Sequence, residues 1–253
     1  MGETVLITGA TSGIGRATAR LLAEKGYRLI LAGRRKERLD TLRVELEGTS
    51  GQEVFTLCFD VRNPHEVETA IASLPPTFQP IDILINNAGL AAGLDPVQEG
   101  SLQDWENMID TNVKGLLYIT RQVAPMMTAR KKGHIINISS IAGKETYPMG
   151  NVYCATKHAV QSLTKAMRLD LLNYGIKVSS VAPGAVNTEF SLVRFKGDQQ
   201  RADKVYEGFT PLYGHDIAET ILFILSRPAH VCIDDILIMP AAQAYSRDFN
   251  REG

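Results

Sequence analysis

The stretch Thr8-Gly9-Ala10-Thr11-Ser12-Gly13-Ile14-Gly15 decides the fold, because it joins a short apolar run at residues 5–8 to an amphipathic stretch at residues 14–24. Its glycines permit a tight turn, close approach of the backbone to a pyrophosphate, and close packing of a helix on a strand. Unpaired N–H groups and the positive dipole end of a helix favour phosphate at the same place. A glycine-rich turn alone is a weak signal. Directly after the first strand and at the start of a helix, it predicts a dinucleotide-binding βα unit.

Apolar runs alternate with helical patterns along the whole chain. Strands are expected at residues 5–8, 28–32, 54–59, 83–86, 134–139, 177–182 and 233–239, and helices at residues 14–24, 39–46, 66–73, 105–127, 153–173 and 216–225. Short strands that are apolar throughout are typical of a parallel sheet buried on both faces. The alternation predicts an α/β fold, a doubly wound (Rossmann) parallel sheet of about seven strands with helices on both faces. No linker divides the pattern, so we expect residues 1–253 to form a single domain.

Two segments do not fit this alternation. Residues 183–213 are too long for an ordinary connection. They follow the sixth expected strand at the ligand-binding edge of the sheet, so we expect a substrate lid at residues 187–213. The tail at residues 240–253 is polar, and we expect it to be mobile.

The composition argues against several classes of protein. The 27 basic and 28 acidic residues are interspersed and give a formal charge of −1, which does not favour binding to nucleic acid or to a membrane surface. No apolar run approaches the length of a membrane span, and the N-terminus lacks the pattern of a signal peptide. The cysteines, Cys58, Cys154 and Cys232, are odd in number and far apart. They fit reduced thiols in the cytoplasm better than disulfides or a metal site.

The end of the second expected strand indicates which dinucleotide binds. Enzymes that prefer NAD usually place Asp or Glu about 20 residues after the glycines, where it accepts hydrogen bonds from the ribose 2′-hydroxyl. Here the strand ends in Ala32-Gly33-Arg34-Arg35, with no acid. Guanidinium groups match the oxygens of a 2′-phosphate, so Arg34 and Arg35 predict NADP(H) as the cofactor. The alternative is a solvated basic turn that continues into Lys36 and Arg38.

Two further strand ends belong to the same crevice. Asp60-Val61 closes the third expected strand, where a carboxylate is placed to accept a hydrogen bond from the adenine amino group. Asn86-Asn87-Ala88-Gly89 closes the fourth. Open α/β sheets bind ligands outside the carboxyl ends of their strands, so we assign Asp60, Val61 and Asn87 to the cofactor site. Each stretch alone is equally compatible with an ordinary turn.

Tyr153 and Lys157 carry the expected chemistry. They lie four residues apart on a helical stretch, so their side chains share one face. A tyrosine with its ordinary pKa of about 10 is a poor acid–base catalyst at neutral pH, and a neighbouring ammonium lowers that pKa. Ser139-Ser140, at the end of the fifth expected strand, adds a hydroxyl donor at the same edge of the sheet. The alternative is an ordinary pair on a helix surface.

Because these motifs occur in this order, the chain resembles the short-chain dehydrogenase/reductase family over essentially all of its length. The residues that carry the resemblance are the glycine turn, Asn86-Asn87-Ala88-Gly89, Asn112, Ser140, Tyr153-x-x-x-Lys157 and Pro183-Gly184. The family's spacing between serine and tyrosine selects Ser140. The resemblance implies that Tyr153 is the acid–base and that Ser140 orients the carbonyl. It also implies that Lys157 binds the nicotinamide ribose and lowers the tyrosine pKa, and that Asn112 supports a proton-relay water.

The resemblance extends the expected cofactor site and implies an assembly. Pro183, Gly184, Val186 and Thr188, which follow the sixth expected strand, are expected to contact the cofactor. The family uses the equivalents of the helices at residues 105–127 and 153–173 as a subunit interface. Helices that are apolar beyond one stripe need a second burial partner. We therefore expect a homotetramer of dihedral symmetry.

A narrower resemblance indicates the substrate. Residues 86–93 (NNAGLAAG), 105–115 (WENMIDTNVKG), 189–198 (EFSLVRFKGD) and 228–231 (PAHV) are similar to bacterial NADP-dependent 3-hydroxy acid dehydrogenases, also described as serine or L-allo-threonine dehydrogenases and malonic semialdehyde reductases. This implies an oxidoreductase that transfers a hydride between NADP(H) and a small 3-hydroxy acid or its semialdehyde. One alternative is a reductase of a larger ketone or a 3-oxoacyl substrate. A second is a nucleotide-sensing binding protein, which would be expected to lack an intact tetrad.

Substrate contacts are expected from Ser140, Tyr153 and Arg194. Arg194 and Lys196 lie in the expected lid, and the planar guanidinium of Arg194 is better suited to hold a carboxylate bidentately. Phe190 and Phe195 are expected to close over the site and exclude water. The alternative is that Arg194 faces solvent or pairs with Asp198.

Overall fold

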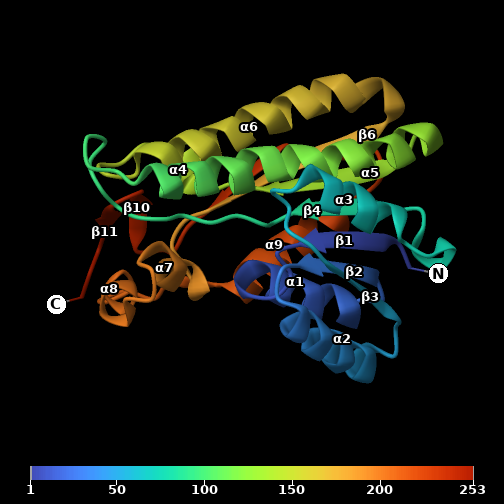
Figure 1. Cartoon of the computed structure of the whole chain (residues 1–253), viewed down its shortest axis with the longest axis horizontal. Helices are drawn as coiled ribbons and strands as arrows, with labels where there is room; N and C mark the ends of the chain where they lie inside the picture. Colours follow the sequence, from blue (N-terminus) through green and yellow to red (C-terminus); the bar gives the residue numbers. More distant parts are fainter. Residues whose placement is uncertain (1, 253) are drawn as a thin grey trace.

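The computed structural model describes residues 2–252, and its centre is a parallel sheet of seven strands in the order β3-β2-β1-β4-β5-β6-β9 (Figure 1). The strands are β1 (Thr4–Thr8), β2 (Arg28–Gly33), β3 (Val54–Cys58), β4 (Ile83–Asn86), β5 (Gly133–Ile138), β6 (Ile176–Pro183) and β9 (Asp235–Ile238). Strand order reverses between β1 and β4, which creates the crevice where ligands of such sheets bind. The predicted doubly wound parallel sheet is confirmed.

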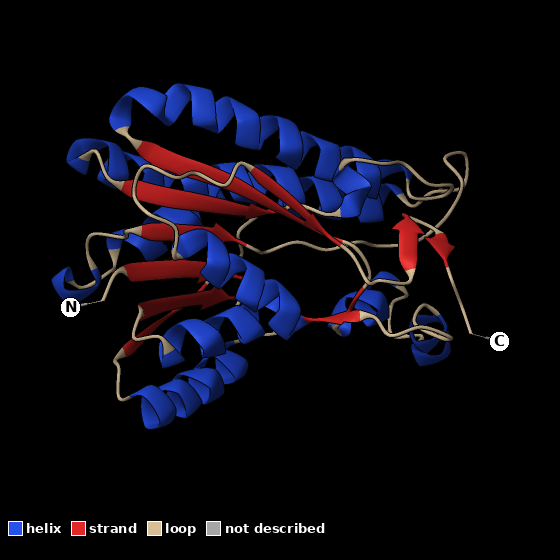
Figure 2. Cartoon of the chain, turned by 180° about the vertical axis from the view of Figure 1, so that it is seen from behind, coloured by secondary structure: helices blue, strands red, loops and turns tan. Residues whose placement is uncertain are grey.

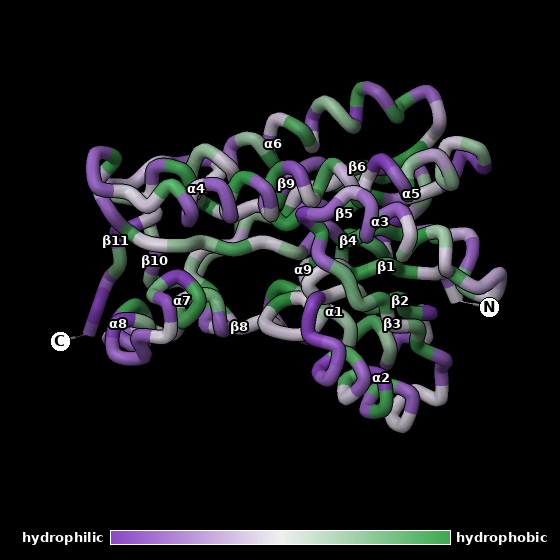
Figure 3. Tube along the Cα trace, viewed as in Figure 1, coloured by the Kyte–Doolittle hydropathy of each residue, from purple (hydrophilic) through white to green (hydrophobic). Residues whose placement is uncertain are grey.

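Helices cover both faces of the sheet (Figure 2). One face packs against α3 (Pro64–Ala72), α5 (Leu116–Arg130) and α6 (Asn151–Leu171), and the other against α1 (Gly13–Glu24), α2 (Lys36–Ser50) and α9 (Gly214–Leu225). Because side chains alternate along a strand, Leu6 of β1 packs with the first group, whereas Val5 and Ile7 pack with the second. The central strands are accordingly mostly hydrophobic along the trace, and the outer helices alternate in hydropathy (Figure 3).

The helix expected at residues 105–127 is interrupted. α4 (Leu102–Ile109) leads into a π-helical turn, η2 (Asp110–Gly115), before α5 begins. A Cβ on Gly115 would lie 2.8 Å from Cγ2 of Val61, so this turn brings the backbone against the segment that follows β3. π-helical turns inside α-helices are frequent at functional sites, and this one carries Asn112. The last strand is also shorter than expected, since β9 covers only part of residues 233–239.

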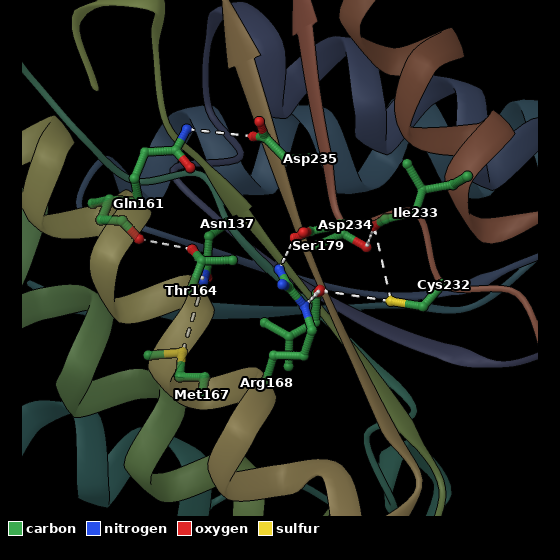
Figure 4. A network of polar contacts seen from close by, with 12 residues as sticks. Asn137, Gln161, Thr164, Met167, Arg168, Ser179, Cys232, Ile233, Asp234 and Asp235 are labelled. Carbon is green, nitrogen blue, oxygen red and sulfur yellow. Dashed lines mark hydrogen bonds and ion pairs between the residues drawn. The ribbon is translucent and has the colours of Figure 1, made fainter. Parts of the chain in front are cut away.

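A polar network fixes the position of α6 along the sheet (Figure 4). The amide of Asn137, on β5, donates to Oγ1 of Thr164 at 2.9 Å and contacts the sulfur of Met167 at 3.7 Å. Arg168 forms an ion pair with Asp234, which immediately precedes β9. Asn137 and Thr164 are buried, and buried polar groups are costly unless they are paired, so their contact sets where α6 lies relative to the strands. The catalytic residues expected on α6 are positioned by this register.

Residues 183–213 contain elements that the sequence did not reveal. β7 (Val186–Asn187) pairs with β8 (Leu212–Tyr213), and α7 (Glu189–Arg194) and α8 (Gln199–Lys204) lie between them. These helices lie beyond the carboxyl ends of the central strands (Figure 1). Three 3₁₀ turns lie elsewhere in the described chain, η1 (Pro76–Phe78), η3 (Ile141–Gly143) and η4 (Leu172–Tyr174).

The expectation of a mobile tail was wrong for its described part. β10 (Gln243–Tyr245) and β11 (Asp248–Phe249) form an antiparallel hairpin. The ring of Phe249 stacks on that of Phe209 with 4.7 Å between centroids, and Ser246 donates two hydrogen bonds to the carboxylate of Glu145. These partners lie far away in the sequence, so the polar composition of the tail does not reveal them. Gly253 lies outside the described residues.

Within residues 2–252, no helix is long and apolar enough to cross a bilayer. The same residues contain no group of three or more His, Cys, Asp or Glu side chains that could hold a metal ion. All three cysteines are free thiols.

Candidate active site

A cavity of ≈ 680 Å³ at the carboxyl ends of the strands brings most of the predicted site residues together. Those that line it are Gly9, Thr11, Ser12, Gly13, Ile14, Arg34, Arg35, Asp60, Val61, Asn87, Ser140, Tyr153, Lys157, Pro183, Gly184, Val186, Thr188 and Arg194. Ala10, Gly15 and Asn112 do not line it and are buried. Small-molecule and cofactor sites usually measure about 300–1,000 Å³, so the cavity has the size of such a site.

The glycine turn leaves no room for side chains. Gly9 and Gly13 have φ angles of 66° and 50°, which glycine adopts without strain. A Cβ on Gly15 would lie 2.5 Å from Nδ2 of Asn87, and this amide donates to the carbonyl oxygens of Thr8 at 2.9 Å and Gly9 at 3.2 Å. Asn87 therefore stabilises the glycine turn. A glycine-rich turn that lines the cavity at the N-terminus of α1 fits the pyrophosphate of a dinucleotide.

A cationic cluster is formed by Arg34 and Arg35, which line the cavity, and by Arg38, which lies next to them against Glu189. Arg35 donates to Oγ1 of Thr11 at 2.8 and 3.1 Å and to Oγ of Ser12 at 2.9 Å. Its Nη1 lies 3.1 Å from a carboxylate oxygen of Glu189, and Nη1 of Arg38 lies 2.8 Å from the other oxygen. The cluster thus joins the glycine turn to the first residue of α7. Its guanidinium groups fit a 2′-phosphate.

Asp60 is held by two arginines. Arg62 donates to both oxygens of its carboxylate at distances between 2.6 and 3.1 Å, and Nη1 of Arg34 lies 3.6 Å away. Burial raises the pKa of this carboxyl, but the hydrogen bonds from Arg62 outweigh burial, so the pKa lies below its usual range. The ionised carboxylate keeps lone pairs for a further donor. Its contact with adenine stays a prediction.

Tyr153 and Lys157 lie one turn apart on the buried side of α6, and Ser140 lies at the end of β5. Burial raises the pKa of the Tyr153 phenol, and the neighbouring Tyr147 adds to the increase. Arg194 and a hydrogen bond with Ser140 act in the opposite direction. The phenol is therefore protonated at neutral pH. Arg194, which sequence reasoning assigned only to the substrate, is the cation with the largest lowering effect on this pKa.

Lys157 and Asn112 both lie beside the loop that follows β4. The ammonium of Lys157 donates to the carbonyl oxygen of Ile138 at 3.0 Å, and burial lowers its pKa to about 8. The amide of Asn112 donates to the carbonyl oxygen of Leu90 and accepts from its N–H, both at 2.8 Å. A Cβ on Gly89 would lie 3.2 Å from Oδ1 of Asn112 and 3.4 Å from Nζ of Lys157. The Asn112 side chain thus fixes this loop, and its support of a proton-relay water stays a prediction.

Arg194 lines the cavity. Its Nη2 donates to the hydroxyl of Tyr147 at 2.5 Å, and its Cζ lies 4.9 Å from the centroid of the Tyr153 ring and 5.5 Å from that of Phe190. Its Nε is buried and has no hydrogen-bond partner among the described residues. Asp198 caps α8 through the N–H of Arg201. The alternative of an Arg194–Asp198 pair does not describe this structure.

The family model for short chain dehydrogenases matches residues 3–198. The chain belongs to the short-chain dehydrogenase family. It is 48% identical over 243 residues, 96% of each chain, to NADP-dependent 3-hydroxy acid dehydrogenase YdfG of Salmonella typhi. It is 43% identical over 246 residues, 97% of each chain, to serine 3-dehydrogenase of Agrobacterium fabrum. The solved closed form of serine dehydrogenase complexed with NADP+ is similar with a TM-score of 0.92 and 44% identity, covering 99% of each chain.

The comparisons confirm the resemblance inferred from the motifs, and this short-chain dehydrogenase is an oxidoreductase. Its cavity also contains residues that sequence reasoning missed. Arg247, in the C-terminal hairpin, places its Cζ 4.9 Å from the centroid of the Tyr147 ring. Arg38, on the first turn of α2, does not itself line the cavity but pairs with Glu189, which does; it lies three residues after Arg35, so its spacing was a usable signal. Arg247 and Glu189 carry no such local signal, because their partners lie far away in the sequence.

Proposed function

We propose that the dehydrogenase transfers a hydride between NADP(H) and a small 3-hydroxy acid or its semialdehyde. The position of Arg194 carries the proposal, because its buried Nε has no partner in the described chain and its guanidinium lies beside Tyr153. A guanidinium that lines the cavity next to a proton-transferring tyrosine suits a substrate whose carboxylate is close to its reacting carbon. The relatives named for 3-hydroxy acid and serine dehydrogenation support the same substrate class.

Two alternatives have less support. A reductase of a larger ketone or 3-oxoacyl substrate has no use for a cation at the reacting centre, and a nucleotide-sensing protein does not need a complete set of Ser140, Tyr153 and Lys157. Oxidation of NADPH with small semialdehydes, larger ketones and 3-oxoacyl thioesters tests all three functions. We expect the highest kcat/KM with a semialdehyde. A preference for the thioesters or ketones would overturn the substrate class, and no turnover would overturn the enzyme.

Several parts of the cavity are suited to NADP(H). The N–H groups at the start of α1 suit the pyrophosphate, and the cationic cluster suits the 2′-phosphate. The ammonium of Lys157 is a donor for the nicotinamide ribose. The remaining wall of the cavity is lined by residues at the end of β6 and at the start of the lid, namely Pro183, Gly184, Val186 and Thr188. When bound, NADP(H) supplies or accepts the hydride.

Tyr153 and Ser140 act on the substrate oxygen in the proposed reaction. In reduction the Tyr153 hydroxyl donates its proton to this oxygen, and in oxidation the phenolate accepts the proton. Ser140 Oγ accepts from the N–H of Ala142 at 3.1 Å and makes a long contact of 3.5 Å with the carbonyl oxygen of Pro183. Such a long contact is weak, so a substrate carbonyl that replaces the Tyr153 oxygen as the partner of Ser140 can accept the Ser140 proton and be oriented by it. The charge of Lys157 favours the phenolate in the oxidation direction.

Residues 187–213 form the substrate lid in this proposal. The ring of Phe190 lies 5.6 Å from that of Tyr153, and Phe195 also lines the cavity. Both rings exclude water from the reacting centre when the segment covers it. A small hydroxy acid has little apolar area, so its carboxylate supplies orientation and affinity by accepting from Arg194.

Arg194→Met is expected to lower kcat/KM at least about tenfold on a 3-hydroxy acid and to change it little on the neutral methyl ester, because only the acid loses a charge-assisted contact. Lys196→Met is the matched control. Lys196 pairs with Asp104 at 2.8 Å and does not line the cavity, so both substrates should be unaffected. Equal losses on acid and ester with Arg194→Met would mean that the residue supports the lid and does not recognise charge.

The same variant has a second expected effect, on pH dependence. Arg194 lowers the pKa of Tyr153, so its removal raises that pKa. Oxidation of the alcohol needs the phenolate, and kcat for oxidation therefore rises with pH as Tyr153 loses its proton. In Arg194→Met, the rising limb of the pH profile of kcat for oxidation, measured on the neutral ester, should move to higher pH. An unchanged limb or a shift to lower pH would contradict this electrostatic role.

We also propose that residues 1–253 act as one domain of a homotetramer in the cytoplasm. Large apolar side chains lie exposed on the outer helices, Leu102 on α4, Leu117 on α5, Leu169 on α6 and Leu172 directly after it. Exposed apolar surface of this kind is typical of subunit interfaces. The free thiols support a reducing compartment.

Sedimentation equilibrium is expected to give four times the 27.8 kDa mass of one chain. Replacing Leu169 and Leu172 by glutamate places unpaired charges in the proposed interface and is expected to dissociate it. Val44→Glu, on the outer side of α2, is an equally exposed apolar control and should leave the mass unchanged. A monomeric mass of the unaltered chain at micromolar concentration would refute the assembly.

A further inference from the structure

Glu189 lies in the cationic cluster that we assign to the 2′-phosphate. One of its carboxylate oxygens is 3.1 Å from Nη1 of Arg35, and the other is 2.8 Å from Nη1 of Arg38. The remaining guanidinium nitrogens of Arg35 donate to Thr11 and Ser12 of the glycine turn. Glu189 thus accepts from Nη1, the one nitrogen of Arg35 that makes no hydrogen bond to the glycine turn.

A carboxylate and a phosphate compete for these donors. Both anions accept from the same edges of a guanidinium, and two like charges in one site repel each other. A phosphate monoester carries about −1.5 to −2 charges at neutral pH, more than a carboxylate. The Glu189 side chain is 40% exposed, so it is able to turn into solvent without leaving a buried charge behind. Of the two anions, Glu189 is therefore the one that gives way.

Glu189 is also connected to the catalytic centre. It is the first residue of α7, and the same short helix carries Phe190 and Arg194. The ring of Phe190 lies 5.6 Å from that of Tyr153, and the guanidinium carbon of Arg194 lies 4.9 Å from it. A change at the start of α7 therefore reaches both lid side chains that contact Tyr153.

We propose that Glu189 is an internal competitor for the 2′-phosphate site, which holds α7 on the cationic cluster and releases it when NADP(H) binds. The inference rests on the proposed function, because it needs a cofactor with a 2′-phosphate. It also gives the lid a way to distinguish the two nicotinamide cofactors. NAD(H) has no group to displace Glu189, so the start of α7 stays attached to Arg35 and Arg38.

The first test is the affinity of Glu189→Gln for 2′,5′-ADP and for ADP, measured by calorimetry at low salt. The variant keeps the shape of the side chain and removes its charge. We expect 2′,5′-ADP to bind about three- to tenfold more tightly than to the unaltered chain, since two partly exposed ion pairs no longer compete. ADP, which lacks the 2′-phosphate, should bind equally to both. Unchanged or weaker binding of 2′,5′-ADP would overturn the inference.

Glu207→Gln is the matched control. It removes the same charge from the same segment, but Glu207 does not line the cavity, so neither affinity should change. The unaltered chain separates this inference from the proposed function. If it binds 2′,5′-ADP no better than ADP, the cofactor assignment fails and the inference fails with it. If it prefers 2′,5′-ADP and Glu189→Gln does not improve on it, the inference alone fails.

A second measurement follows the lid without any nucleotide. Trypsin has cleavage sites at Arg194, Lys196, Arg201 and Lys204, within the segment that Glu189 holds. Because locally opened segments are cleaved faster, Glu189→Gln should be cut there faster than the unaltered chain and than Glu207→Gln. Equal rates for all three would show that Glu189 does not hold the lid.

Discussion

Tyr153→Phe is expected to reduce kcat by about 10²–10⁴-fold, the usual contribution of a positioned proton donor, while NADPH binding is almost unchanged. Phenylalanine keeps the ring that packs against Phe190 and removes the hydroxyl that exchanges a proton with the substrate. The phenol is buried, so water has little access to replace it as a donor. Stopped-flow measurement of hydride transfer with a semialdehyde separates this chemical step from cofactor binding.

Tyr118→Phe is the matched control, because it removes the same hydroxyl from a tyrosine on α5 that does not line the cavity. Its turnover should equal that of the unaltered enzyme. If the kcat of Tyr153→Phe is within a few-fold of that of the unaltered enzyme, another group is the acid. A large loss of NADPH affinity would instead assign Tyr153 to cofactor binding.

The fold was predictable because strands buried on both faces carry their own signal. Val5, Leu6 and Ile7 are all fully buried, and such runs are apolar throughout instead of alternating. Helix boundaries were harder to predict. The π-helical turn at Asp110–Gly115 depends on the close approach of Gly115 to Val61, a contact between elements far apart in the sequence. Apolar periodicity describes one helix at a time and does not detect such a contact.

The residues of the site likewise include some that the sequence reveals and others that it does not. Tyr153 and Lys157 share a helical face, and Ser140 ends a strand, so spacing and position reveal them. The partners of Arg35 and Arg38 on α7 are more than 150 positions away. The hairpin that brings Arg247 to the cavity is held by Glu145, which is 101 positions from Ser246. No spacing rule covers such distances. The sequence therefore predicted cations at the cofactor site but not the acid that pairs with them.

The double change Arg34→Ala with Arg35→Ala is expected to weaken NADP+ binding at least about a hundredfold, because each arginine contributes a charge-assisted contact with the 2′-phosphate worth about 1.5–3 kcal/mol. The lower end applies, since the two side chains are 58% and 41% exposed. NAD+ has a 2′-hydroxyl in place of the phosphate, so its affinity should change little. Calorimetric titration of both cofactors gives the ratio directly.

Arg20→Ala with Arg43→Ala removes the same charge from pairs with Glu45 and Glu47 that do not line the cavity, and it controls for the general effect of charge on an anionic ligand. If this control weakens NADP+ as much as the test variant does, the effect comes from the field of the whole protein. Equal affinity of the unaltered enzyme for NADP+ and NAD+ would contradict the assignment of NADP(H) as the cofactor. A specific loss of NADP+ binding, with Arg38 still in place, would assign the discrimination to Arg34 and Arg35, the two arginines between β2 and α2.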